Sequence, residues 1–289
     1  MVETFGQALR RLRGSMSIRE LARQAHCGKS HVSDLERGRR ALYRTQAVLY
    51  LAAAKLATRT GDHDLAWIAA DRGQQAALAA DAPVLVATLR RQIACVFHDT
   101  GRLADADQVI TTALDALRRD GVQDEPDLIS ARGSLHLLGA MISTRCGGLA
   151  QARQQFAAAA DQAHALGRDD NRLWTAFGPT NVAIHTLAAV TLDDPMQAIH
   201  VAERIDTRLL PAPLIGRRVR VQIDLARAHA SLGEDATATV HILDVAHRAP
   251  QMLRYDTAAR TVCSTLLGRA QGSTVSVLRA AAKQAGIAA

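Results

Sequence analysis

Aromatic residues make up only 3% of this 289-residue sequence, and the β-branched residues that strands also favour are sparse in its periodic stretches. The composition therefore argues against an all-β or doubly wound fold. No apolar run reaches the roughly 18 residues that a membrane-spanning helix needs. Residues 1–13 also lack the apolar stretch of a secretory signal. We therefore expect no membrane partner.

Residue patterns that carry metal or catalytic chemistry are also missing. The chain has four widely separated cysteines without a C-x-x-C pair, namely Cys27, Cys95, Cys146 and Cys263. This spacing argues against a disulfide framework and a zinc site. The eleven histidines show no H-E-x-x-H spacing, and there is no Gly-rich phosphate loop or G-x-S-x-G motif. We expect a cytoplasmic protein that is not an enzyme and holds no metal or cofactor.

Alanine, in contrast, is abundant. The 56 alanines are about a fifth of the chain, and Leu, Arg, Gln and Glu fill much of the remaining periodic sequence. These residues favour helices, so we predict an all-α protein. The length of 289 residues allows about two domains.

Positive charge is concentrated at the N-terminus. Residues 1–45 hold ten basic and four acidic side chains, which accounts for most of the net charge of +7. The remaining body is nearly neutral. A small basic head on a neutral body indicates that the head alone meets a polyanion, with nucleic acid favoured over a membrane surface.

Three short helices are predicted in the first 40 residues. Residues 4–13 form a helix with three apolar side chains on one face, which are Phe5, Leu9 and Leu12. A second helix follows over 18–25, where Ser17 and Glu20 have the spacing of a capping box. A third short helix runs from about Lys29 to Arg37 and is ended by Gly38, a residue typical of helix stops.

The stretch IRELARQAHCGKSHVSDLERG (18–38) resembles the lambda-repressor-like (Xre-type) helix-turn-helix family. Seven positions match the family pattern in order, namely Leu21, Ala22, Ala25, Val32, Leu35, Glu36 and Gly38. By this resemblance, four side chains form the apolar contact between the two helices: Leu21, Ala25, Val32 and Leu35. The turn position that usually holds glycine is His26, which must tolerate or avoid a left-handed conformation.

The resemblance implies double-stranded operator DNA as a partner. The third helix would be the recognition helix and would present three side chains to base edges in the major groove: Lys29, Ser30 and Asp34. Four further side chains would lie nearer the phosphates: Ser33, Arg37, Arg39 and Arg40. The family's domain normally continues into two closing helices, whereas this chain passes soon after Arg40 into a different periodic pattern.

From residue 41 onward the pattern small-x6-G-x4-A-x3-apolar-x2-small recurs five times, with substitutions in the fourth copy. The alanine after the glycine marks each copy: Ala66, Ala106, Ala152, Ala198 and Ala238. These alanines are 40, 46, 46 and 40 residues apart. Small residues at the facing positions let two antiparallel helices approach closely, and the glycine ends the first helix of each pair.

The pattern resembles tetratricopeptide repeats over about residues 41–248, with a longer period than their usual length of roughly 34 residues. A sixth, degenerate pair over about 250–286 would cap the stack. We therefore predict a short helix-turn-helix head (1–40) followed by an α-α superhelix of about six tetratricopeptide-like helix pairs (41–289). In such stacks the first helix of each pair lines a concave groove.

We expect the lining of this groove, counted from the repeat glycines, to include Lys55, Arg91, His98, Met141, Arg220 and Arg227. Arg220 and Arg227 are seven residues apart and share one face of their helix. Guanidinium groups in a groove would suit an acidic peptide or a C-terminal carboxylate. The alternative is that these are solvated charges on a wide groove.

Residues 171–185, NRLWTAFGPTNVAIH, are unlike their surroundings. Pro179 inside a helix would remove a backbone hydrogen bond, bend the helix and expose a polar patch. The alternative is a kink whose two aromatic side chains pack in the core. The head, the repeats and this string together resemble a family of regulators common in high-GC Gram-positive (actinobacterial) bacteria. By resemblance to peptide-sensing relatives, Asn181 would fix the ligand backbone, with Trp174 and His185 nearby.

These patterns predict a transcriptional regulator whose helix-turn-helix head is controlled by a peptide, small-molecule or protein ligand in the repeat groove. A homodimer is also considered, because a single short helix-turn-helix usually needs a partner to reach useful affinity. The alternative function is a protein-interaction scaffold with a vestigial DNA-binding head, which the missing closing helices favour.

Overall fold

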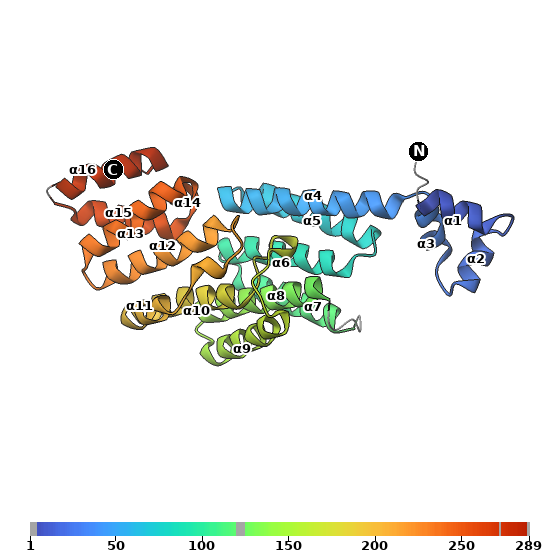
Figure 1. Ribbon diagram of the computed structural model, residues 1–289, viewed down its shortest axis with the longest axis horizontal. Coiled ribbons are helices and arrows are strands. Elements are labelled where there is room, and N and C mark those ends of the chain that lie inside the picture. Colours follow the sequence, from blue (N-terminus) through green and yellow to red (C-terminus); the bar gives the residue numbers. More distant parts are fainter. Residues whose placement is uncertain (1–4, 120–124, 272, 288–289) are drawn as a thin grey trace.

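The structure is a computed structural model that describes residues 5–119, 125–271 and 273–287. The described residues form helices and connecting turns, with no strand among them. The fold class is therefore all-α, as the composition predicted. Figure 1 shows an elongated molecule with the head at one end and the last helices at the other.

The head consists of three short helices, which are α1 (Phe5–Arg13), α2 (Ile18–Gln24) and α3 (Lys29–Glu36). Their bounds agree with the sequence prediction to within one residue. Gly38 follows with a left-handed φ of 65°, as expected for a residue that stops a helix. A long helix then begins at once, so the head is joined to the rest of the chain without a flexible linker.

Beyond the head, helices alternate as antiparallel pairs. The five pairs are α4 (Arg39–Thr60) with α5 (His63–Ala79), α6 (Pro83–Asp99) with α7 (Leu103–Arg119), α8 (Pro126–Arg145) with α9 (Leu149–Leu166), α10 (Pro179–Asp193) with α11 (Pro195–Glu203), and α12 (Ile215–Ser231) with α13 (Asp235–Arg248). Three further helices are α14 (Pro250–Tyr255), α15 (Thr257–Arg269) and α16 (Ser273–Ala285). Short 3-10 turns lie at Arg172–Trp174 and Thr207–Leu209. We call the part from α4 onward the array.

Small residues hold the paired helices together at the predicted positions. The five marker alanines are at most 4% exposed. The glycines between paired helices adopt positive φ, at Gly61, Gly101, Gly147 and Gly233. In the fourth pair no glycine is present, and Asp194 instead caps α11 by accepting a hydrogen bond from the backbone N–H of Gln197 at 2.9 Å. The helix pairs predicted from the repeat pattern are therefore present.

The end of the array differs from the predicted sixth pair because it contains three helices. The short α14 begins at Pro250 and is followed by α15, where Asp256 accepts a hydrogen bond from the backbone N–H of Ala259 at 3.1 Å. One continuous apolar cluster joins α12 to α16, with Ile223, Leu266 and Leu278 at its centre. These helices cover the apolar end of the stack.

The predicted kink at Pro179 is wrong. Residues 167–178 leave the helical path as a loop, and α10 begins at Pro179, where the missing N–H of proline costs little. A Cβ on Gly178 would lie 2.5 Å from Cα of Asp169, so this close approach requires glycine. Asp169 Oδ1 in turn accepts a hydrogen bond from the backbone N–H of Thr180 at 3.1 Å. We call residues 167–178 the mid-array loop.

The array curves far enough to bring its first helix, α4, against α14 near its other end. Nη1 of Arg59, near the end of α4, lies 3.5 Å from Sδ of Met252 in α14. Figure 1 shows α14 beside the end of α4 that lies away from the head. The mid-array loop is held to α8, where Arg172 Nη1 donates to Asp127 Oδ1 at 2.8 Å. Segments distant in sequence therefore face a common interior.

Candidate functional sites in the head and at the centre of the array

The turn between α2 and α3 has the backbone that the helix-turn-helix pattern predicts. Ser17 Oγ accepts a hydrogen bond from the backbone N–H of Glu20 at 3.1 Å and so caps α2. The carboxylate of Glu20 faces Arg23, at 3.9 Å, so only half of the capping box forms. His26 adopts a left-handed φ of 51°. It therefore accepts the conformation for which glycine is the usual residue.

Few apolar side chains are buried in the part of the head that the structure describes. Ala22 and Val32 are each 3% exposed, and Leu21 and Leu35 are half-buried. The prediction that Ala25 packs between the helices is wrong, because α2 ends just before it and its side chain is exposed. Ala22, one turn earlier, is buried instead. Leu12, on the predicted apolar face of α1, is 75% exposed and therefore adds little to the core of the head.

The predicted DNA contacts differ in their surroundings. Three are exposed on or after α3, namely Lys29, Ser30 and Arg37. Ser33 and Asp34 are half-buried, and Asp34 Oδ1 lies 3.7 Å from Nε of Arg39. Arg40 points to the array, where its Nη1 donates to Oδ2 of Asp81 at 3.1 Å. Arg40 thus connects the head to the turn between α5 and α6.

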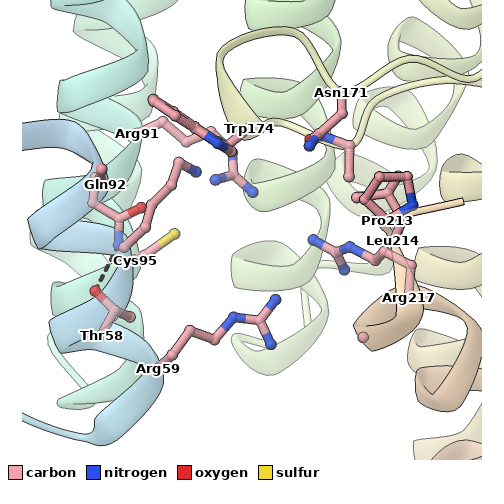
Figure 2. A pocket seen from close by; sticks show the side chains of 14 residues that line it. Thr58, Arg59, Arg91, Gln92, Cys95, Asn171, Trp174, Pro213, Leu214 and Arg217 are labelled. Carbon is pink, nitrogen blue, oxygen red and sulfur yellow. Dashed lines mark hydrogen bonds between the residues drawn. The ribbon is translucent and has the colours of Figure 1, made fainter. Parts of the chain in front are cut away.

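A cavity of about 420 Å³ lies between helices of the array, and Arg59 in its lining is exposed to solvent. Its walls are α4, α6, the mid-array loop and the segment that leads into α12 (Figure 2). The polar lining consists of Lys55, Thr58, Arg59, Arg91, Gln92, Cys95, Asn171 and Arg217. Residues from four separate parts of the chain therefore meet at one place.

Four basic side chains converge on this cavity, and no acidic residue lines it. Figure 2 shows the guanidinium groups of Arg59 and Arg217 extending toward each other from opposite walls. Arg91 is 8% exposed, and its Nε donates to the backbone oxygen of Ser134 at 3.0 Å. In the part of the chain that the structure describes, neither Lys55 nor any of these three arginines forms an ion pair. The positive charges of the three arginines, and of Lys55 when it is protonated, are therefore uncompensated.

The mutual approach of these cations alters their protonation. Burial, reinforced by the charge of Arg91, lowers the pKa of Lys55 to about 7. Burial, together with the charge of Arg59, lowers the pKa of the Arg217 guanidinium to about 9. Both shifts have the direction expected for basic groups that are poorly solvated and surrounded by like charge.

The mid-array loop forms one wall of the cavity and has a strained backbone. Leu173, Trp174 and Ala176 have φ values of 47°, 53° and 51°, which residues other than glycine rarely adopt. Asn171 Oδ1 accepts a hydrogen bond from the backbone N–H of Ala176 at 3.2 Å. Trp174 remains 45% exposed beside the cavity, whereas Leu173 packs on the apolar core between α4 and α6. Strain of this kind is concentrated at functional sites.

Two predicted ligand residues, Asn181 and His185, lie on α10 and do not line the cavity. Asn181 is 1% exposed, and its Oδ1 has no hydrogen-bond partner. His185 Nδ1 donates to the backbone oxygen of Asn181 at 2.8 Å. Burial, with the charge of Arg217, lowers the pKa of His185 to about 3, so its imidazole is neutral at pH 7. A ligand contact by Asn181 stays a prediction.

Three other predicted groove residues contact acidic side chains. Arg220 donates to both carboxylate oxygens of Asp224, at 3.0 and 3.1 Å, and to Asp256 at 3.2 Å. Arg227 Nη1 lies 3.8 Å from Asp224, whose side chain is fully buried. His98 Nδ1 lies 2.9 Å from the carboxylate of the next residue. The charges of Arg220 and Arg227 are compensated within the chain, unlike those at the cavity.

The sequence placed Lys55, Arg91 and Trp174 at the groove, and the structure brings these three together at the cavity. It missed Arg59 and Arg217. Arg59 follows Lys55 by one helical turn, so the i, i+4 spacing was a usable signal. Arg217 offered no such signal, because it reaches the cavity only through the curvature of the array.

Within residues 5–119, 125–271 and 273–287, no three His, Cys, Asp or Glu side chains are grouped so that they could hold a metal ion. None of the described helices combines the length and the apolar character needed to cross a membrane. The four cysteines are free thiols.

The comparisons with known proteins concern the head and the helices next to it. A family model described as a helix-turn-helix domain matches residues 4–65, which extends beyond α3 through α4 and into the beginning of α5. A search among curated proteins found no match to the chain. This match and the three helices with a left-handed turn at His26 show that the N-terminal part of the chain is a helix-turn-helix domain.

Proposed function

We propose that this protein is a cytoplasmic, DNA-binding transcriptional regulator without catalytic activity, and that α3 enters the major groove. The observation that carries the proposal is the helix-turn-helix match over 4–65, which coincides with the positively charged part of the sequence. Lys29 and Ser30 at the exposed start of α3 would contact base edges, and Arg37 would contact a phosphate.

The array is proposed to be the sensor that controls the head. α4 starts directly after Gly38 of the head and packs with α5 in the first pair. The ion pair between Arg40 and Asp81 is a second link between the two parts. A ligand that binds one curvature of the array more tightly than another would therefore change the position of the head. Peptide, small-molecule and protein ligands are the classes considered.

A second copy of the chain is the proposed partner of α4. Three leucines on this helix, seven residues apart, are exposed by 69%, 66% and 67%, namely Leu42, Leu49 and Leu56. Leucines at this interval form a single stripe, the pattern through which helices pair. A single recognition helix reads one half-site, so pairing through α4 would let two heads bind one operator.

DNA from upstream of the protein's own gene provides the test, with an unrelated duplex of equal length for comparison. Fluorescence anisotropy would measure both affinities over a range of salt concentrations. We expect Lys29→Ala to weaken binding to the upstream DNA by about 1–3 kcal/mol and to reduce discrimination between the duplexes. Arg37→Ala should weaken binding to both duplexes about equally and lower the salt slope by about one.

Arg153→Ala is the matched control, because it removes an exposed arginine from α9, far along the chain from the head. Its DNA affinity should equal that of the wild type. The proposal would be contradicted if upstream DNA were not preferred and if Lys29→Ala and Arg37→Ala left the affinity unchanged.

The second candidate is a protein-interaction scaffold with a vestigial head. It is favoured by the small number of buried apolar side chains described in the head, where Leu12 and Ala25 are exposed. Limited proteolysis separates the two candidates. A head that is removed much faster than the array is digested would support the scaffold, and a resistant head would support the regulator.

A further inference from the structure

The basic cavity between α4, α6, the mid-array loop and the start of α12 has a charge that nothing in its lining balances. We propose that it binds a small phosphorylated ligand that carries at least two negative charges. The ligand would be the one that the proposed sensor detects. The cavity alone supports ligand binding, and only the effect of the ligand on DNA binding rests on the proposed function.

The charge of the cavity selects the class of ligand. Lys55, Arg59, Arg91 and Arg217 line it, and Arg91 is more than nine-tenths buried without a carboxylate partner. An uncompensated buried charge is costly to maintain, so an anion should bind there. A single carboxylate, such as a peptide C-terminus, would neutralise one of the four groups. A phosphate monoester or pyrophosphate carries more charge and accepts several charge-assisted hydrogen bonds.

The start of α12 adds a second source of positive potential. This helix has 17 residues, and Gly216 and Arg217 from its first turn line the cavity. The residue at its N-cap is Leu214, and no side chain caps the first backbone N–H groups. Uncapped N–H groups and the helix dipole together favour a phosphate group at a helix N-terminus.

The remaining lining fits the rest of a small molecule. Trp174 is 45% exposed and offers a flat apolar surface, held by the strained backbone of the mid-array loop. The volume of about 420 Å³ lies within the range of roughly 300–1,000 Å³ that is typical of small-molecule sites. A metabolite therefore fits this cavity better than a folded partner or a long peptide segment.

Isothermal titration calorimetry of the full chain with pyrophosphate, in sodium chloride at about physiological ionic strength, tests the assignment. We expect one binding site per chain. Arg59→Gln and Arg217→Gln should each weaken binding at least about tenfold, because each removes a charge-assisted contact. Arg153→Gln removes an exposed arginine from α9 and should leave the affinity unchanged.

Two other anions distinguish phosphate from carboxylate chemistry. Citrate carries several carboxylates, and a short peptide carries one at its C-terminus. Weaker binding of both than of pyrophosphate supports the proposal. Equal or tighter binding of either one overturns the assignment to a phosphorylated ligand.

Thermal unfolding distinguishes a ligand-binding role of these cations from a purely structural one. Without ligand, Lys55→Met and Arg59→Gln remove repulsion between like charges, so both should raise the Tm. Pyrophosphate should raise the Tm of the wild type and have much less effect on these variants. A lowered Tm in both variants without ligand would identify the cations as structural and would contradict the proposal.

The site is overturned if pyrophosphate does not bind the wild type, or if Arg59→Gln and Arg217→Gln bind it as tightly. DNA affinity is measured separately on the same samples. If the protein binds pyrophosphate but not DNA, the anion site is supported and the proposed regulator function is overturned. If it binds DNA but not pyrophosphate, the anion site is overturned and the regulator function is supported.

Discussion

Lys55 is the side chain at the cavity whose charge changes near neutral pH, because its pKa is about 7. The ionisable groups around it are Arg59 on α4, Arg91 and Cys95 on α6, and Arg217 on α12. A bound anion would stabilise the protonated amine and raise this pKa. Binding above pH 7 would therefore take up a proton, and the affinity would fall as the pH rises further.

We expect an uptake of about 0.5 to 1 proton per pyrophosphate bound slightly above pH 7. Calorimetry in two buffers with different ionisation enthalpies measures this number. Lys55→Arg is the control, because its guanidinium stays charged over this pH range, and any uptake that it shows belongs to pyrophosphate itself. Equal uptake by the wild type and by Lys55→Arg would contradict the role of Lys55.

His26 shows how a residue can be strained by its place in a motif. A φ of 51° costs a residue other than glycine roughly 1–2 kcal/mol. Glycine would avoid this cost, but its greater conformational entropy in the unfolded chain would offset part of the stabilisation. We expect His26→Gly to stabilise the head by about 0.5–1 kcal/mol, measured by hydrogen exchange of the α2 and α3 amides. His31→Gly, inside α3, should instead destabilise it by a similar amount. If His26→Gly instead destabilised the head, the backbone at His26 would not be strained.

At the scale of helices, the five pairs could be predicted from the repeat pattern. The positions where paired helices face one another hold small residues, and these can be recognised in the sequence. Ala66, Ala106 and Ala238 are fully buried at these positions. The mid-array loop escaped prediction because nothing local distinguishes a proline inside a helix from one that begins it. Its path is set by contacts with distant residues, such as Arg172 with Asp127.

The mid-array loop is also held by a glycine in α8. A Cβ on Gly133 would overlap the ring of Phe177, which is fully buried at the end of this loop. We expect Gly133→Ala to lower the free energy of unfolding by about 1–3 kcal/mol, measured by urea denaturation. It should also weaken pyrophosphate binding, because the loop forms a wall of the cavity.

Gly139→Ala, further along α8, is the matched control. A Cβ there would lie 3.3 Å from the side chain of Gln155, so a shift of a few tenths of an ångström would accommodate it. This variant should be neutral or slightly stabilising, because alanine favours a helix over glycine by about 1 kcal/mol. Equal losses in Gly133→Ala and Gly139→Ala would show that the contact with Phe177 is not the cause.

At the scale of the whole molecule, the exposed leucines of α4 predict the oligomeric state. Leu49 is the middle residue of the stripe and is 66% exposed. We expect the wild type to sediment as a dimer and Leu49→Asp to sediment as a monomer, because a buried carboxylate without a partner opposes association. The variant should bind operator DNA more weakly, since only one head then engages each site. A monomeric wild type would refute this arrangement.

The control for the dimer is Leu209→Asp, which places the same charge on an exposed leucine in the turn before α12. It should remain a dimer. Dissociation of both variants would indicate a general loss of structure, which circular dichroism would detect.

The cavity as a whole could be predicted only in part. Lys55 and Arg91 follow from the repeat register, because they precede Gly61 and Gly101 by 6 and 10 residues, which differ by about one helical turn and place both on the same helix face. The contributions of Arg217 and the mid-array loop depend on how far successive pairs rotate around the superhelix. That rotation is the sum of many small packing angles, so the sequence of any single pair does not determine it.

α4 is a single continuous helix that connects the head to the cavity. It carries the head at its first residue and Lys55 and Arg59 of the cavity near its last, over 22 residues. Such a helix is about 33 Å long, so a tilt of about 5° at the cavity end would move the head by about 3 Å. In a dimer, recognition helices must match half-sites about 34 Å apart on DNA. In the proposed regulator, α4 would therefore act as a lever arm, so that a small displacement around a bound anion would change the fit of two heads to one operator.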